Sequence, residues 1–354
     1  MSALETTIMT PAEASAMVDN VFKSVNSALP FSSVFPLVDN DGKENVTWTP
    51  NQPLELVDMV DFRGWDAEVG YGKSVSQTGE KLAPLMPLGK RMHVSERDII
   101  GHVNDKSWLR ERFSDYFGRL ATEVAVRMEM LRVSALVNAK FDVNINGQKV
   151  PYDFGRDATL SGVKPTKNWG TKTSTPVDDI KAWRNLLVAV NGVLPEAVIT
   201  TRKVMDTLAT NAQIIQLATK TNETTMPTMV SDNDVRNVLE SYCGLTEIRL
   251  IDEAYKSFQT TYAMRLPSFV NTLLPEGTFL MFSSFNDSAL GATFVGPTGE
   301  AESAEYGLNK SVNTGLVGAV LSDTAPLRYD TYITGTMMPI LVQSNNTFQA
   351  SVLG

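Results

Sequence analysis

Apolar residues recur every three or four positions through one long stretch in the first half of the chain. The stripe consists of Leu109, Phe113, Phe117, Leu120, Val124, Met128, Leu131 and Ala135. This spacing predicts a single amphipathic helix, and about 33 residues give a rod of roughly 50 Å. Its other face carries Arg110, Glu111, Arg112, Asp115, Arg119, Glu123, Arg127, Glu129 and Arg132. We expect that face to be solvated, with ion pairs between subunits as the alternative.

The residues before this helix predict only short elements. Residues 1–35 begin with a weak helical pattern that Pro30 interrupts, and they are too few to form a domain, so we expect them to lean on something else. Apolar and polar side chains alternate in residues 36–60, as they do in strands, and predict a hairpin with its turn at Asp41-Gly42. Residues 61–98 hold several glycines, two prolines and no helix of useful length. Loops this long inside a compact domain are usually functional.

The chain after the long helix predicts a mixed α/β region. Residues 143–155 read as a hairpin, and residues 156–175 as a polar connection. Apolar periodicity and capping signals predict helices over 175–192, 202–219 and 231–244. Short β-rich runs predict strands over 196–200, 246–252 and 277–284, and two more in 327–353. No internal repeat is found in the sequence.

Composition narrows the class of protein. The net charge of −9 makes non-specific attraction to nucleic-acid backbones unexpected. The single cysteine, Cys243, excludes a disulfide framework within one chain and fits a reducing compartment. The sequence shows neither a secretion signal nor an apolar run of the roughly 18 residues that span a bilayer. We therefore expect an intracellular protein without membrane contact.

A phosphate-binding loop is the most conspicuous chemical motif, and its context argues against it. Gly72-Lys73-Ser74 matches the end of the motif, but the required first glycine is Ala67. The flanking residues predict neither the buried strand nor the helix that would cradle a phosphate. The same glycines do not complete a dinucleotide fingerprint, because its third position falls on Val75. We interpret the glycines as sources of backbone freedom in an extended loop.

The remaining candidates for chemistry also have structural explanations. His93 and His102 lack metal-ligand spacing and have no nucleophile motif beside them. Asp178 and Asp179 stand in the first turn of a predicted helix, where negative charge suits the helix dipole. The run Asp39–Glu44 suits a hairpin turn better than a calcium loop. We expect no catalytic residues, no metal and no cofactor.

The order of elements resembles the major capsid protein of tailed bacteriophages, and most resembles the lambda-type major head protein family. The resemblance rests on "GYGKSVSQTGEKLAPLMPLGKRMHVSERD", on the long helix after it, and on the end "LRYDTYITGTMMPILVQSNNTFQASVLG". It implies an α+β tailed-phage major capsid fold. The implied parts are an N-terminal arm (1–35), a strand hairpin of the peripheral domain (36–60), an extended loop (61–98), the peripheral domain with its spine helix (99–175), an axial α/β domain (176–325) and C-terminal strands returning to the peripheral domain (326–354).

The resemblance implies a protein that self-assembles into the icosahedral shell around the double-stranded DNA genome of a tailed bacteriophage. Its implied partners are other copies in pentamers and hexamers, a separate scaffolding protein, a portal and a possible decoration protein. The DNA would be enclosed without sequence-specific binding. The implied location is the virion, with assembly in the cytoplasm of the bacterial host.

The extended loop supplies the expected contacts between subunits. A two-stranded hairpin cannot bury its own apolar residues, and aromatic side chains are enriched at interface centres. The expected contact residues are Phe62, Arg63, Trp65, Tyr71, Lys73, Leu85 and Met86. Lysine–asparagine crosslinks, with Lys73 or Lys81 and Asn345 or Asn346 as partners, occur in some relatives but are not expected here, because such residues are common in loops and at chain ends.

Three alternatives remain open at this point. A shell protein of a nanocompartment would share the fold and package a cargo enzyme. A phage tail or neck protein would form tubes or rings instead of closed shells. An enzyme that hydrolyses nucleotides would bind phosphate through Lys73.

Overall fold

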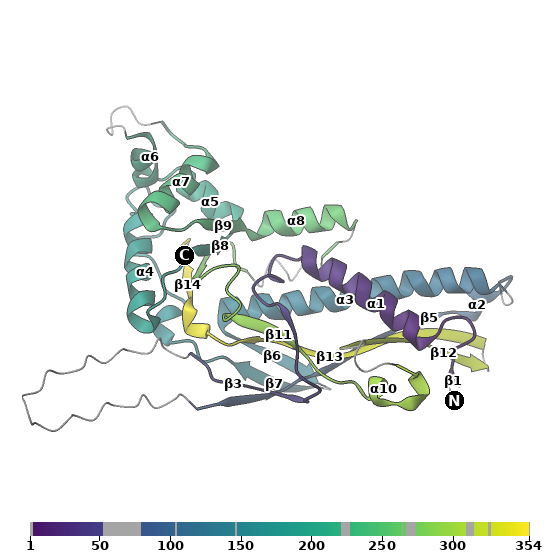
Figure 1. Ribbon diagram of the computed structural model, residues 1–354. Helices are drawn as coiled ribbons and strands as arrows, with labels where there is room; N and C mark the ends of the chain where they lie inside the picture. Colours follow the sequence, from purple (N-terminus) through teal and green to yellow (C-terminus); the bar gives the residue numbers. More distant parts are fainter. Residues whose placement is uncertain are drawn as a thin grey trace, which may run out of the picture.

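The computed structural model describes residues 3–51, 79–102, 105–145, 147–220, 227–263, 265–266, 274–308, 315–324 and 327–353. These residues form two lobes arranged in an L (Figure 1). One lobe is long and contains the six-stranded sheet, and the other rises from its end and contains a four-stranded sheet. One cluster of buried apolar side chains fills the long lobe and extends to Ile199 and Phe282 of the four-stranded sheet, and a second cluster fills the other lobe.

Strand β13, Leu327–Leu341, is the centre of the six-stranded sheet. Strands β12 and β5 flank its first part from opposite edges, and β11 pairs with its last residues, Met337–Leu341. Two short strands complete the sheet, β1 beside β12 and β2 beside β11. The bounds are Ala3–Leu4 for β1, Leu37–Asp39 for β2, Pro87–Val94 for β5, Gly291–Val295 for β11 and Leu316–Thr324 for β12.

Two helices pack along this lobe, α1 (Pro11–Ala28) and α3 (Lys106–Asn138) (Figure 1). Helix α3 has 33 residues and is capped by the preceding Asp105, whose side chain accepts a hydrogen bond from the Trp108 N–H. All eight residues of its predicted apolar stripe are buried, which confirms the helix and its inner face. Helix α1 packs against α3 and β12, so the N-terminal segment leans on its own chain.

Helix α1 begins with a reciprocal cap that makes a testable contribution to stability. The Thr10 hydroxyl accepts from the Glu13 N–H, and the Glu13 carboxylate accepts from the Thr10 N–H. We expect Thr10→Ala to lower the free energy of unfolding by about 1 kcal/mol, measured by urea unfolding of the unassembled chain. Ser24→Ala, on the exposed middle of the same helix, is the control and should change it by no more than about 0.5 kcal/mol. Equal effects of the two substitutions would show that the cap contributes nothing specific.

The four-stranded sheet of the second lobe has the order β14-β10-β8-β9. Its strands are β8 (Ala197–Thr200), β9 (Glu247–Leu250), β10 (Thr278–Phe282) and β14 (Thr347–Ser351). The helices around it are α4 (Pro176–Asn191), α5 (Arg202–Ala209), α6 (Ala212–Thr219) and α7 (Asp232–Cys243). Stacked and edge-on aromatic rings fill its core, among them Trp169, Trp183, Phe279 and Phe348. Helix α8 (Ile251–Thr261) reaches back toward α1 (Figure 1).

Smaller elements lie at the edges of the long lobe. Strands β3 (Asn45–Trp48) and β4 (Lys81–Pro84) pair as a two-stranded ribbon, and β6 (Lys140–Ile145) pairs with β7 (Gln148–Asp153) as the predicted hairpin. Two one-turn helices, α2 (Glu96–Ile99) and α10 (Gly299–Glu302), complete the described helices, together with 3₁₀ turns at Ala158–Leu160, Ala304–Tyr306 and Ser344–Asn346.

Several predicted pairings and boundaries are wrong. The turn at Asp41-Gly42 exists, with both residues at positive φ, but the strands on either side do not pair with each other. Strand β2 pairs with β11 and β3 pairs with β4, so the expected 36–60 hairpin is divided between two sheets. The described part of the 61–98 loop, from 79 onward, is mostly strand, because β5 pairs with β13 along its whole length.

The second lobe also departs from the predicted boundaries. Strand β14 lies in the four-stranded sheet and does not return to the long lobe, whereas β11 and β12, inside the range expected to be axial, belong to the six-stranded sheet. The helix expected over 202–219 is two helices, because Asn211 caps α6 by accepting from the Gln213 and Ile214 N–H groups. Helix α8 begins where a strand was expected to continue.

The charged face of α3 is solvated only in part. Glu129 and Arg132, expected in solvent, are 3% and 0% exposed. Arg132 donates from Nη1 to Asn26 Oδ1 (2.7 Å) and from Nε to Thr293 Oγ1 (3.0 Å). Glu129 Oε1 accepts from the Phe31 N–H at 3.0 Å, and its other oxygen lies 3.5 Å from Arg132 Nη1. The pair therefore joins α3 to α1, to the segment after α1 and to β11.

Burial gives this pair a distinctive dependence on pH. Loss of solvent raises the pKa of Glu129 to about 7, although Arg132 and the Phe31 N–H oppose the shift. Burial lowers the pKa of Arg132 and raises that of the neighbouring Tyr255. Between the ordinary carboxyl pKa of 4.5 and a pKa of about 7, the folded chain holds a proton that the unfolded chain has lost.

This contribution to the free energy of unfolding should decrease as the pH rises through that interval, by up to about 1.4 kcal/mol per pH unit. The measurement is urea unfolding of the wild-type chain and of Glu129→Gln between pH 5 and 8. Glutamine keeps an acceptor for the Phe31 N–H but does not titrate. Parallel pH profiles for the two chains would contradict the assignment.

Candidate intersubunit site

The strands of the ribbon β3–β4 are the described strands that flank residues 52–78 in the sequence. Its register places Val46 opposite Ala83 and Trp48 opposite Lys81. Val46, Trp48 and Ala83 are buried against the chain, while the opposite face is open, with Leu82 65% exposed. An isolated two-stranded ribbon is marginally stable in water. Packing on one face therefore holds the ribbon, and the other face is available to a partner.

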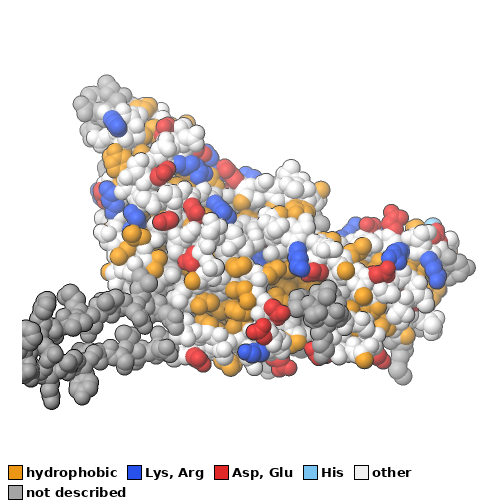
Figure 2. Space-filling view, in the orientation of Figure 1, with side chains coloured by type: hydrophobic (Ala, Val, Ile, Leu, Met, Phe, Trp, Pro, Cys, Tyr) orange, Lys and Arg blue, Asp and Glu red, His pale blue; other side chains and the backbone are white. Residues whose placement is uncertain are grey.

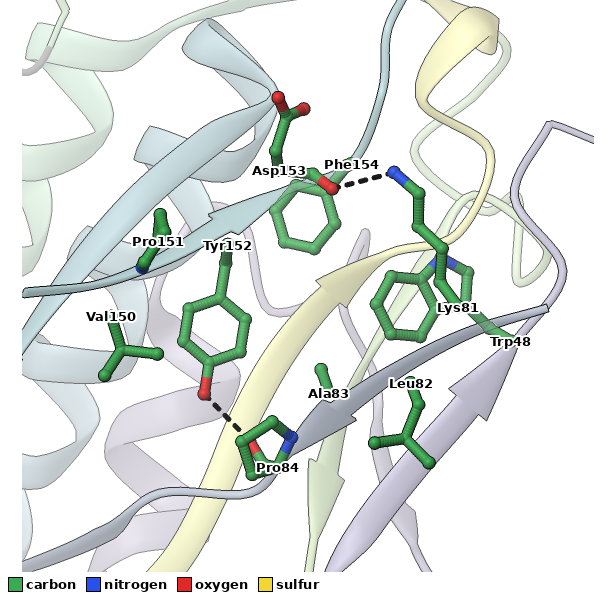
Figure 3. A pocket seen from close by; sticks show the side chains of 10 residues that line it. All are labelled: Trp48, Lys81, Leu82, Ala83, Pro84, Val150, Pro151, Tyr152, Asp153 and Phe154. Atoms are coloured by element: carbon green, nitrogen blue, oxygen red, sulfur yellow. Dashed lines mark hydrogen bonds between the residues drawn. The ribbon is translucent and has the colours of Figure 1, made fainter. Parts of the chain in front are cut away.

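Two hydrogen bonds attach the ribbon to β7 (Figure 3). The Lys81 ammonium donates to the Asp153 carbonyl at 2.9 Å, and the Tyr152 hydroxyl donates to the Pro84 carbonyl at 2.8 Å. The Tyr152 ring also stacks on Phe141, and burial raises the pKa of its hydroxyl to about 12. Tyr152 is therefore a neutral donor near pH 7.

A groove of about 180 Å³ separates the ribbon from the hairpin β6–β7. Figure 3 shows the Tyr152 and Lys81 side chains crossing it toward the facing strand. The indole N–H of Trp48 is buried there and has no hydrogen-bond partner among the described residues. The residues lining the groove are Trp48, Lys81, Leu82, Ala83, Pro84, Val150, Pro151, Tyr152, Asp153 and Phe154. Its mixed polar and apolar lining suits contact with a polypeptide.

The predicted contact residues divide into two groups. Phe62, Arg63, Trp65, Tyr71 and Lys73 lie outside the described residues. Leu85 and Met86 follow β4, and both pack on the core of the long lobe. Leu85 is 6% exposed, so its burial is already completed by its own chain. The exposed Leu82, which was not among the predicted residues, is the apolar side chain that the described ribbon leaves open.

Residues considered for catalysis have structural partners. His102 stacks on Trp108 at 4.3 Å, and His93 lies on β5, opposite Asp330 of β13. Asp179 accepts from the indole N–H of the buried Trp169 at 3.0 Å and so holds the loop before α4. No group of three or more potential metal ligands occurs within the described ranges.

Residues considered for crosslinking are engaged inside the chain. Lys81 donates to the Asp153 carbonyl, Asn345 Oδ1 accepts from the Asp157 N–H, and Asn346 pairs with Asn191. The residues of the phosphate-loop motif at 72–74 lie outside the described part of the chain.

The sequence reasoning missed Asn51 and Tyr152, which fix the base of the ribbon. Asn51 adopts a positive φ of 50° and donates from Nδ2 to the Gly155 carbonyl at 3.0 Å. Asparagine tolerates this conformation better than most residues, and Asn51 stands between two prolines, Pro50 and Pro53. That composition indicates a turn, but it does not indicate which carbonyl the side chain contacts.

Charge on the surface argues against a nucleic-acid groove on the face in Figure 2. Lysines and arginines are interspersed there with aspartates and glutamates, and hydrophobic side chains gather between them. A phosphate-binding surface would concentrate positive charge. No helix within the described ranges combines the length and hydropathy needed to cross a bilayer.

Several solved structures share this fold at low sequence identity. A putative capsid protein of a prophage from Escherichia coli CFT073 has a TM-score of 0.60 at 13% identity, over 99% of this chain and 99% of that chain. A phage-related protein from Bordetella bronchiseptica RB50 has a TM-score of 0.54 at 9% identity, over 100% and 98%. The capsid of Myoviridae phage XM1 has a TM-score of 0.50 at 11% identity, over 90% and 90%. These likenesses show the tailed-phage capsid fold.

Sequence comparison identifies the family. No curated protein matches the chain. The family model for phage major capsid protein E matches residues 91–302, more than half of the 354 residues. The match runs from β5 through α3 and the helices of the second lobe to α10. The chain therefore belongs to the phage major capsid protein E family and is a shell-forming capsid protein of a bacteriophage.

Proposed function

We propose that many copies of this chain close into the icosahedral head of a tailed bacteriophage and enclose its double-stranded DNA genome. The match to phage major capsid protein E over residues 91–302 is the observation that carries the proposal. The lambda-type subfamily remains a prediction. The shell would be built from pentamers and hexamers, with a separate scaffolding protein, a portal and a possible decoration protein as partners. Assembly would take place in the cytoplasm of the bacterial host.

In this proposal the two lobes have separate roles in the shell. The lobe with the six-stranded sheet and α3 is the peripheral domain, and the lobe with the four-stranded sheet is the axial domain around the five- and six-fold positions. The ribbon and the segment after it lie on an adjacent subunit. The open face of the ribbon around Leu82 supports this role, because an exposed apolar side chain there is available for burial by a neighbour.

The protein acts as a structural component without catalysis. The net charge of −9 would repel the DNA backbone, so it suits a shell that confines DNA better than a protein that adheres to it. Stability of the shell would come from the sum of many modest interfaces.

Electron microscopy of particles from expressed protein tests the proposal. The protein is expressed with and without a co-expressed scaffolding protein, and we expect closed icosahedral shells. Particles from infected cells should protect double-stranded DNA from added DNase and show a high ratio of absorbance at 260 nm to that at 280 nm. Shells filled with a protein cargo would indicate a nanocompartment, and tubes or rings a tail or neck protein. Compact monomers under all conditions would contradict the shell assignment.

A further inference from the structure

Asn51 makes more contacts than a turn residue needs. Its backbone N–H donates to the Val342 carbonyl at 3.3 Å. Its side-chain Oδ1 accepts from the Asn345 N–H at 2.7 Å and lies 3.0 Å from the Ser344 hydroxyl. Its Nδ2 donates to the Gly155 carbonyl. The Asn51 side chain therefore contacts two segments that are distant in the sequence. One is the segment after β7, at Gly155, and the other contains Ser344 and Asn345.

That second segment, residues 342–346, is where the chain passes from one sheet to the other. Strand β13 of the long lobe ends at Leu341, and β14 of the second lobe begins at Thr347. The connection is a 3₁₀ turn, Ser344–Asn346, in which Ser344 is fully buried. Its position sets how the C-terminal strand enters the four-stranded sheet.

Side-chain hydrogen bonds also hold this connection to the second lobe. Asn345 Oδ1 accepts from the Asp157 N–H at 2.8 Å, and Asn346 Oδ1 accepts from the side chain of Asn191, the last residue of α4. Asn346 and Asn191 are both buried. The connection thus contacts Asn51 on one side and the end of α4 on the other.

Arg156 ties the end of α3 to the same point. Its guanidinium donates to the Leu136 and Val137 carbonyls in the last turn of α3 and to Thr347 Oγ1 at 3.0 Å. The carbonyls that end a helix need such partners when they are buried. The junction of the two lobes is therefore a continuous network of directional hydrogen bonds, and networks of this kind carry coupling between distant sites.

We infer that Asn51 couples the ribbon to the junction between the lobes, so that the seating of the ribbon biases the angle between the two sheets. The inference rests on the proposed function in one respect, which is that the ribbon lies against a neighbouring subunit in the shell. A subunit whose ribbon is seated then holds its 342–346 connection in one arrangement. In the proposed shell, copies at five- and six-fold positions have different neighbours, and Asn51 would link the lobe angle of each copy to its neighbour.

Amide hydrogen exchange on the unassembled chain tests the coupling directly. Asn51→Gly removes the side-chain bonds but keeps a residue that accepts positive φ. Lys81→Met with Tyr152→Phe loosens the ribbon from β7 and leaves Asn51 intact. The reporter is the Asn346 N–H, which donates to the Gln343 carbonyl within the connection and keeps this acceptor in both backgrounds.

We expect loosening the ribbon to raise the exchange rate of the Asn346 amide about fivefold when Asn51 is present. The same two substitutions should have little effect in the Asn51→Gly background. An equal effect in both backgrounds, or no effect in either, would overturn the coupling. Thr47→Ala, on the exposed face of β3, is the control and should leave the exchange rate of the Asn346 amide unchanged.

A second measurement examines the shell. Asn51→Gly protein should still assemble but give particles with a broader distribution of diameters than wild type in micrographs. A distribution identical to wild type would overturn the role of Asn51 in assembly. Failure of wild-type protein to form shells would instead contradict the proposed function, and the exchange experiment would still decide the coupling.

Discussion

Arg132→Met is expected to lower the free energy of unfolding by about 3–5 kcal/mol. The substitution leaves Glu129 buried without its cationic partner, so the carboxyl must take up a proton or remain an unpaired charge. It also removes the donor to Asn26 on α1 and the donor to Thr293 on β11. Three elements thereby lose their common contact. Urea unfolding of the unassembled chain at pH 7.5 measures the change.

Two variants distinguish the effect of breaking the Glu129–Arg132 pair from the effect of losing one positive charge. Arg127→Met removes an exposed arginine from the same helix and should change the free energy of unfolding by no more than about 0.5 kcal/mol. The double variant Glu129→Leu with Arg132→Met removes both charges, and we expect it to be more stable than Arg132→Met alone. If the double variant loses as much free energy of unfolding as the single variants Glu129→Leu and Arg132→Met lose in sum, the pair has no coupling energy.

The burial of this pair marks a limit of sequence reasoning about α3. The apolar steps from Leu109 to Ala135 specify which face of the helix meets the sheet, and that prediction is confirmed. Periodicity does not reveal that another element covers part of the polar face. The segment that follows α1 contacts Glu129 through the Phe31 N–H, across 98 residues of sequence. A charged residue in a regular polar stripe gives no local signal of such a contact.

The sheets show the same limit for strand pairing. Short β-rich runs between turn residues identify β8, β9 and β10 as strands. It does not identify partners such as Ala3 and Ser322, which pair across more than 300 residues. The error at Asp41-Gly42 has this origin, since a good turn sequence predicts the reversal but not the separate sheets on either side.

The sequence predicts a segment that contacts another subunit, but it does not predict how the flanking ribbon is anchored. The glycine-rich composition of 61–98 and its lack of an apolar face indicate a segment that needs a partner. The anchoring contacts of Asn51 and Tyr152 depend on carbonyl groups that only the folded chain brings close. Leu85 was expected to contact another subunit, but its own chain already buries it. An apolar residue next to a loop therefore does not by itself indicate a partner.

Replacing residues 52–78 by a short glycine–serine linker is expected to abolish shell formation and leave the subunit folded. The ribbon register pairs Trp48 with Lys81, so the ends to be joined are close together. Shortening a surface loop costs little stability. The deleted segment holds Phe62, Trp65 and Tyr71, the aromatic residues expected at the interface. Three such anchors at about 2 kcal/mol each amount to roughly a 10⁴-fold loss in association.

Electron microscopy and analytical ultracentrifugation of the purified variant give the readout, and urea unfolding gives the measure of folding. Ser74→Ala in the unshortened chain is the matched control, because it alters the phosphate-loop motif and keeps every expected contact residue. We expect that control to form normal shells, whereas loss of nucleotide binding in it would favour an enzyme. Shells of wild-type geometry from the shortened chain would show that the segment makes no essential contact. Ordered monomers that fail to assemble would place the interface in the segment, because the ribbon and both lobes remain in the variant.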